Sequence, residues 1–209
     1  MSAAPSFAAH AAILAAVGEG GEARLQAAAT NWADEGGDAG GLLRLLRFSH
    51  LFFGIPKVLR ALNVLSAAEN ALPAANARDP HPDPPAEGWQ AAGEARFREV
   101  YGDDAERVLA HLAYLDPVLH AWVLGHAYGR TGAVHGLPLP LAERLSVLAL
   151  AATRCPDQCR SHVRAALRHG VTMATLDGDI DAAGWLDAVA RATLRTLLRA
   201  ESGDAEAAR

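Results

Sequence analysis

The stretch VLALAATRCPDQCRSHVRAALRHGV, residues Val147–Val171, combines an apolar run, a short polar turn, an amphipathic run and a glycine stop. The stretch ILAAVGEGGEARLQAAATNWADEGG, Ile13–Gly37, has the same order of features without a gap, at an offset of 134 residues (170 − 36, from Gly170 and Gly36). Such a helix pair cannot bury its apolar face alone. We therefore expect an all-α fold built from two helical repeats, with the two copies packed against each other.

Composition agrees with helices and with a sizeable core. The chain has 209 residues, of which 51% are hydrophobic and only 6% aromatic. Alanine, leucine and arginine favour helix, and the residue types that favour strands are sparse. A chain of this length suits one large domain or two small ones, and its two cysteines do not form a disulfide framework.

Charge and hydropathy exclude two classes of partner. The net charge is −5 and no basic cluster is visible, whereas nucleic acid requires an electropositive face. The apolar run near the N-terminus has no basic residues before it and is shorter than the roughly 20 residues that span a bilayer. We expect a cytoplasmic protein with no nucleic-acid partner and no membrane partner.

A proline-rich segment divides the chain. Five of the eleven prolines lie between Leu72 and Gly88, and each removes a backbone donor and disfavours helix before it. The sequence predicts a first helical repeat over 1–72, a linker over 73–88, and a second helical repeat over 89–209 that carries the Cys/His helix. Four helices are expected before the linker, and a last long helix is expected from near Thr172 to about Glu201.

Both cysteines lie at the start of one predicted helix, with Cys155 as its cap and Pro156 at its first position. A thiol at a helix N-terminus feels the positive end of the dipole, which favours the thiolate. Cys159 and His162 follow at helical spacing, so all three side chains can share a face. A redox pair, two small buried residues and a metal site remain alternatives, although zinc would require further ligands that have no obvious spacing here.

The second half resembles a known family over Leu119–Thr172, LHAWVLGHAYGRTGAVHGLPLPLAERLSVLALAATRCPDQCRSHVRAALRHGVT. HAYGR before GLPLPLAERL, the apolar SVLALAAT and the helix SHVRAALRHGVT are similar to the carboxymuconolactone decarboxylase and alkylhydroperoxidase AhpD-like superfamily. In the first half, HLFFGIPKVLRALNVL resembles that family's aromatic-x-Gly-x-Pro segment. The resemblance implies an AhpD-like helical fold and a homo-oligomer, either a trimer or a hexamer.

Peroxidase-type members of this family have a Cys-x-x-Cys pair, a histidine four residues later, and a glutamate on the preceding helix that completes a proton relay. His162 matches the histidine and Cys155 the first cysteine, whereas Gln158 replaces the second and Cys159 is displaced by one residue. In the first copy Ala28 stands where His162 stands in the second. The resemblance therefore implies at most one active site in each chain.

The relay glutamate is expected to be missing. In the family it follows an arginine, whereas here Arg144 is followed by Leu145 and Glu143 lies on the other side of the arginine. The predicted catalytic set is therefore Cys155, Cys159 and His162.

Three functional hypotheses remain open. In the favoured one, the chain is a thiol-dependent peroxidase or disulfide reductase, with the two cysteines as redox pair and His162 as proton acceptor. In the second, it is a cofactor-free lactone decarboxylase-like lyase, with His162 as acid/base and Arg144 or Arg164 holding a carboxylate. In the third, it is a non-catalytic family member. Tyr128, His126 and Arg144 are the residues expected to line a small-molecule pocket, with no cofactor and no metal.

Overall fold

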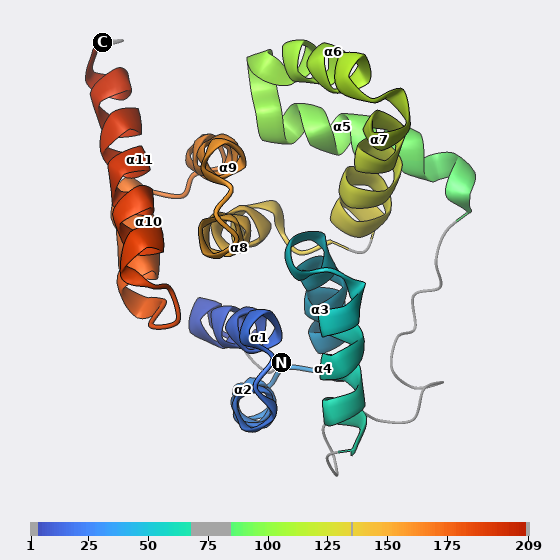
Figure 1. Ribbon diagram of the computed structural model, residues 1–209, viewed down its shortest axis with the longest axis vertical. Coiled ribbons are helices and arrows are strands. Elements are labelled where there is room, and N and C mark those ends of the chain that lie inside the picture. The colour runs from blue at the N-terminus through green and yellow to red at the C-terminus, as the bar shows by residue number, and fades with distance from the viewer. Residues whose placement is uncertain (1–3, 68–84, 135, 208–209) are drawn as a thin grey trace. The chain divides into compact units, whose positions relative to one another are not determined.

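The computed structural model describes residues 4–67, 85–134 and 136–207, and this part of the chain contains helices and no strand (Figure 1). The all-α prediction is confirmed. The chain divides into two compact units, Met1–Asp83 and Pro84–Arg209. The predicted linker over 73–88 lies outside the described residues up to position 84; beyond it, the short 3₁₀ helix η2 (Ala86–Gly88) leads into the second unit.

Within residues 4–67 of the first unit the structure has four helices, as the sequence predicted. They are α1 (Phe7–Glu19), α2 (Glu22–Asp34), α3 (Ala39–Phe53) and α4 (Ile55–Ala67). Ser6 caps α1 by accepting a 3.2 Å hydrogen bond from the N–H of Ala9, which satisfies one of the unpaired donors of the first turn. Helix α1 packs against the other three helices, and the fully buried side chains include Ile13, Leu14, Leu42, Leu45, Leu46 and Leu65.

The second unit ends with four helices that follow one another along the chain as α1–α4 do in the first unit. These are α8 (Leu139–Ala152), α9 (Pro156–Arg168), α10 (Met173–Ala182) and α11 (Ala188–Ala207). Helices α2 and α9 begin and end 134 residues apart (156 − 22 and 168 − 34), and α3 and α10 also begin 134 apart (173 − 39). The internal repeat thus extends from the two helices seen in the sequence to four, and its second copy occupies 139–207.

Local stop and start signals recur at the same offset. Gly36 and Gly170 both follow a helix with left-handed φ values of 84° and 85°, a conformation that glycine adopts without steric cost. Two residues later, Asp38 and Thr172 cap the next helix with their side chains. The copies therefore share backbone geometry at their turns even though few of their side chains are identical.

The expected long last helix is broken in two. Helix α10 ends before Ala183, and Asp187 starts α11 by accepting a 2.8 Å hydrogen bond from the N–H of Ala190. The guanidinium of Arg191 donates to three carbonyl oxygens around the turn, those of Ile180, Ala183 and Leu186. Backbone carbonyls at the end of a helix have no partner within the helix. Here the Arg191 side chain supplies the missing hydrogen bonds, which stabilises the turn between α10 and α11.

Additional helices precede the second copy. They are α5 (Trp89–Tyr101), the short 3₁₀ helix η3 (Gly102–Asp104), α6 (Ala105–Leu115), α7 (Pro117–Trp122) and the π-helix η4 (Val123–Val134). The backbones of α5 and η4 meet closely, because a Cβ on Gly93 would lie 1.8 Å from the carbonyl oxygen of Leu124 and one on Gly129 would lie 2.1 Å from that of Trp89. Around this crossing, a core cluster is formed by Phe97, Ala105, Leu109 and Leu124.

Candidate active site

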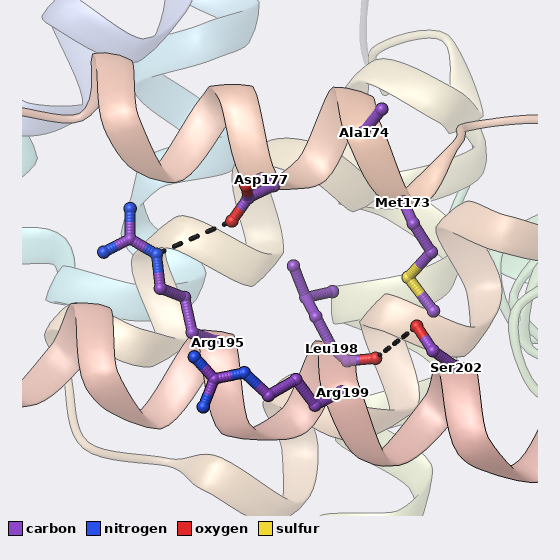
Figure 2. Close-up of a pocket in the computed structure, with 7 residues that line it drawn as sticks. All are labelled: Met173, Ala174, Asp177, Arg195, Leu198, Arg199 and Ser202. Atoms are coloured by element: carbon purple, nitrogen blue, oxygen red, sulfur yellow. Dashed lines mark hydrogen bonds and ion pairs between the residues drawn. The ribbon is translucent and has the colours of Figure 1, made fainter.

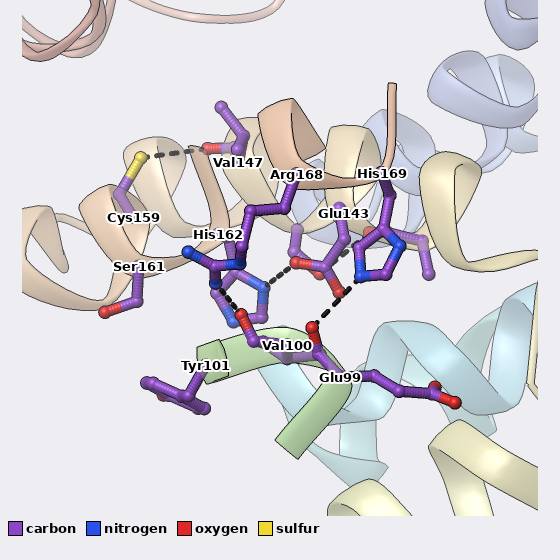
Figure 3. Close-up of polar contacts among 12 residues, drawn as sticks. Glu99, Val100, Tyr101, Glu143, Val147, Cys159, Ser161, His162, Arg168 and His169 are labelled. Atoms are coloured by element: carbon purple, nitrogen blue, oxygen red, sulfur yellow. Dashed lines mark hydrogen bonds and ion pairs between the residues drawn. The ribbon is translucent and has the colours of Figure 1, made fainter. Parts of the chain in front are cut away.

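A buried Glu–His pair joins α8 to α9. Oε2 of Glu143 lies 2.6 Å from Nδ1 of His162, and the side chains are 4% and 14% exposed (Figure 3). The carboxylate accepts a hydrogen bond from Nδ1–H, which fixes the imidazole tautomer and leaves Nε2 as the nitrogen that can exchange protons. The pair has the chemistry of a general acid–base centre.

The expectation that the relay glutamate is missing is corrected by this contact. Glu143 precedes Arg144 instead of following it, yet it is Glu143 that reaches His162. The signal available in the sequence was its helical position: Glu143 lies four residues before Val147 on an otherwise apolar face. Because charged residues on a buried face are nearly always paired, that position indicates a partner on a neighbouring helix.

The two cysteines are free thiols. Cys155 caps α9 with Pro156 at the first position, as predicted, and is half-buried. Cys159 is 1% exposed, and its S–H donates to the carbonyl oxygen of Val147 at 3.5 Å. Burial, together with the neighbouring Cys155, raises the pKa of the Cys159 thiol to about 12. Cys159 is therefore protonated at neutral pH. The thiols of Cys155 and Cys159 donate to backbone carbonyl oxygens, whereas Nδ1 of His162 is bonded to Glu143.

The arginines expected to hold a substrate carboxylate are engaged with carboxylates of the chain itself. Arg144 makes a two-pronged ion pair with Asp179 of α10, with N–O distances of 2.7 and 2.6 Å. Arg164 donates from Nε to the buried Glu201 of α11 at 2.8 Å. Planar guanidinium–carboxylate pairs of this kind are strong and geometrically specific. In this structure they tie α8 and α9 to the two C-terminal helices.

Tyr128 and His126, the other two predicted pocket residues, both lie on η4 and are half-buried. The ring of Tyr128 packs against Phe97 with a centroid distance of 4.8 Å, and its hydroxyl donates to that of Tyr101 at 3.5 Å. Tyr101 was not singled out in the sequence. Burial, first of all, and with it the negative charge of Glu143 raise the pKa values of both tyrosines.

A separate groove of about 400 Å³ lies between α10 and α11 (Figure 2). It is lined by Met173, Ala174, Asp177, Arg195, Leu198, Arg199 and Ser202. Neither member of the Glu–His pair lines it. Within the described residues there is no cluster of three or more His, Cys, Asp or Glu side chains that could hold a metal ion.

No helix in the described part of the chain is both long and apolar enough to cross a bilayer. In a comparison with known families, the model of the carboxymuconolactone decarboxylase family matches residues 117–200. The search of curated proteins and the search of solved structures both give no match. The matched segment runs from the start of α7 into α11 and contains both members of the Glu–His pair. The second unit of the chain is thus similar to the carboxymuconolactone decarboxylase family over these residues.

Proposed function

We propose that the second unit is a cofactor-free lyase of the lactone decarboxylase type, with the Glu143–His162 pair as its acid–base centre. The observation that carries this proposal is the 2.6 Å contact between Glu143 Oε2 and His162 Nδ1, with the carboxylate only 4% exposed. A buried carboxylate that accepts a hydrogen bond from Nδ1 holds the imidazole in one orientation. The high pKa and burial of Cys159 give thiol chemistry less support.

The proposed step consumes one proton for each carbon dioxide released. The bond between the substrate's ring carbon and its carboxylate breaks, and the electron pair moves into the conjugated carbonyl. Carbon dioxide leaves, and Nε2 of protonated His162 gives its proton to that carbon. His162 then regains a proton from water, while Glu143 keeps Nδ1–H hydrogen-bonded throughout.

Carbon dioxide release from a carboxymuconolactone, measured as an initial rate, tests the proposal. We expect His162→Ala to lower the rate by about 10²–10⁴-fold, the usual contribution of a general acid–base group. His111→Ala is the matched control, because His111 is an exposed histidine of α6 in the same unit. A wild-type chain with no activity, or a His162→Ala variant as fast as wild type, contradicts the proposal.

A second candidate is peroxide reduction at Cys155. Its sulfur lies at the N-terminus of α9 and 3.9 Å from the hydroxyl of Thr153, and unlike Cys159 it is only half-buried. The thiolate would attack the peroxide, forming an S–O bond as the O–O bond breaks and an alcohol leaves. A low-molecular-weight thiol would then reduce the sulfenic acid.

Peroxide consumption in the presence of that thiol separates this candidate from the lyase. Cys155→Ser should abolish consumption while Cys159→Ser preserves it, because Cys159 is buried and protonated. Equal rates in Cys155→Ser and wild type contradict the candidate. Inactivity in both assays supports the third hypothesis, a non-catalytic family member.

A further inference from the structure

Three hydroxyl groups converge beside the Glu–His pair. Tyr128 donates to the hydroxyl oxygen of Tyr101 at 3.5 Å, and the Ser161 hydroxyl, which donates to the carbonyl oxygen of Asp157 at 3.4 Å, partly offsets the rise in the pKa of Tyr101 that burial causes. We call Tyr101, Tyr128 and Ser161 the hydroxyl cluster. Ser161 directly precedes His162 on α9, and Figure 3 draws both residues together with Tyr101 at the end of α5. The cluster therefore brings polar groups of α5 and η4 to the face of α9 that carries Ser161 and His162.

Aromatic packing fixes the two phenol rings. Phe97 is fully buried and stacks on Tyr101 with a centroid distance of 4.2 Å and an interplanar angle of 17°. The same Phe97 meets Tyr128 edge to face at 4.8 Å. Rings held on two sides lose little further freedom when they bind a ligand, so the hydroxyls are preorganised.

The backbone next to Tyr101 is tied to the end of α9. Arg168 donates to the carbonyl oxygen of Val100, and Nε2 of His169 lies 3.0 Å from that of Glu99 (Figure 3). These carbonyls belong to the two residues before Tyr101. The helix that carries His162 therefore also sets the position of Tyr101.

Both phenols remain protonated donors. Burial, first of all, and the charge of Glu143 raise the pKa of Tyr101 and of Tyr128. Tyr101 accepts from Tyr128, so its own proton is available to a ligand. A hydroxyl that accepts one hydrogen bond becomes a stronger donor of the next.

We propose that Tyr101 binds the substrate oxygen on which negative charge develops, with Tyr128 acting through it as a positioning residue. This inference rests on the proposed function and names its substrate class: a small planar carbonyl compound that passes through an enolate. As carbon dioxide leaves, the electron pair moves to the carbonyl oxygen, and the O–H of Tyr101 donates to that oxygen. His162 protonates the carbon, so the two residues serve different atoms.

A phenolate probe tests the inference without requiring turnover. 4-Nitrophenolate is planar and carries its charge on one oxygen, and its visible absorbance shifts when that oxygen accepts a hydrogen bond. We expect the wild-type chain to bind it with a spectral shift, and Tyr101→Phe to lose the shift and bind about 10-fold or more weakly, as for a lost hydrogen bond to a charged group. The ring of phenylalanine preserves the stack on Phe97.

Controls separate hydrogen bonding from structure. Tyr114→Phe is the matched control, because Tyr114 is 86% exposed on α6, and its binding should equal that of wild type. Tyr128→Phe should weaken binding less than Tyr101→Phe, and the double variant should be no weaker than Tyr101→Phe alone. If wild type does not bind the probe, or if Tyr101→Phe binds it as wild type does, the inference is overturned.

The kinetic readout distinguishes this inference from the proposed function. If the wild-type chain decarboxylates the lactone, Tyr101→Phe should lower kcat by about 10²–10³-fold, as for loss of one oxyanion donor, with a small change in KM. A chain that releases no carbon dioxide but binds the probe through Tyr101 refutes the lyase and retains the binding site. A normal kcat in Tyr101→Phe refutes the assignment of Tyr101 and retains the lyase.

Discussion

The coupling between Glu143 and His162 can be measured directly by replacing each with alanine and then both. A hydrogen bond to a charged partner contributes about 1.5–3 kcal/mol, and Glu143 is only 4% exposed, so solvent screening is weak. Removing His162 alone leaves a buried carboxylate unpaired, which costs about 3–5 kcal/mol. The double variant removes both partners and leaves no unpaired charge. Its loss of stability should therefore be smaller, by about 1.5–3 kcal/mol, than the sum of the losses in the two single variants.

Native-state hydrogen exchange over α8 and α9 is the appropriate assay, because global unfolding would mix two compact units. It gives the free energy of local opening for the helices that carry the pair. The Arg98–Glu106 pair, whose side chains are 51% and 73% exposed, is a control in which we expect no resolvable coupling. If the stability losses of the two single variants add up to that of the double variant within about 0.5 kcal/mol, the two side chains do not interact and the reasoning is refuted.

Four further predictions concern packing, ionisation and assembly. Gly93→Ala should lower the free energy of unfolding of the second unit by more than about 3 kcal/mol, because its Cβ would lie 1.8 Å from the Leu124 carbonyl oxygen. Gly178→Ala, with open space around it, should raise that free energy by about 0.4–1 kcal/mol. Urea midpoints that move in the same direction in both variants contradict this. Burial raises the pKa of both tyrosines of the hydroxyl cluster, so the folded chain keeps protons that an unfolded tyrosine loses above about pH 10. The free energy of unfolding should therefore fall as the pH rises above about 10, and a rise would be contrary to expectation. Iodoacetamide at about pH 8 should alkylate Cys155 well before Cys159, whose pKa is about 12, as followed by peptide mass spectrometry; equal rates would show that Cys159 is accessible. The expected trimer or hexamer stays a prediction: light scattering should give three or six times the mass of one chain, and a monomer would refute it.

Features set by local sequence were predictable. Cys155 and Pro156 mark the start of α9, and Gly170 its end, because helix caps depend on a few neighbouring residues. The offset between Gly36 and Gly170 predicted the repeat, and the structure extends it to four helices.

Features that depend on contacts between distant residues were not predictable in the same way. Glu143 was set aside because of its order relative to Arg144, yet it meets a histidine 19 positions later (162 − 143). Tyr101 reaches the same region through packing on Phe97 and contacts with the end of α9. The break between α10 and α11 depends on Arg191, whose three carbonyl contacts exist only in the folded turn.

The four-helix duplication has an evolutionary consequence. At the 134-residue offset, Glu143 and His162 correspond to Ala9 and Ala28, which are 0% and 6% exposed. A lone glutamate or histidine at either alanine would be buried without a partner, at a cost of several kcal/mol. A second Glu–His pair at the corresponding positions of the first copy would therefore need both substitutions at once, because each intermediate with a single substitution would be destabilised.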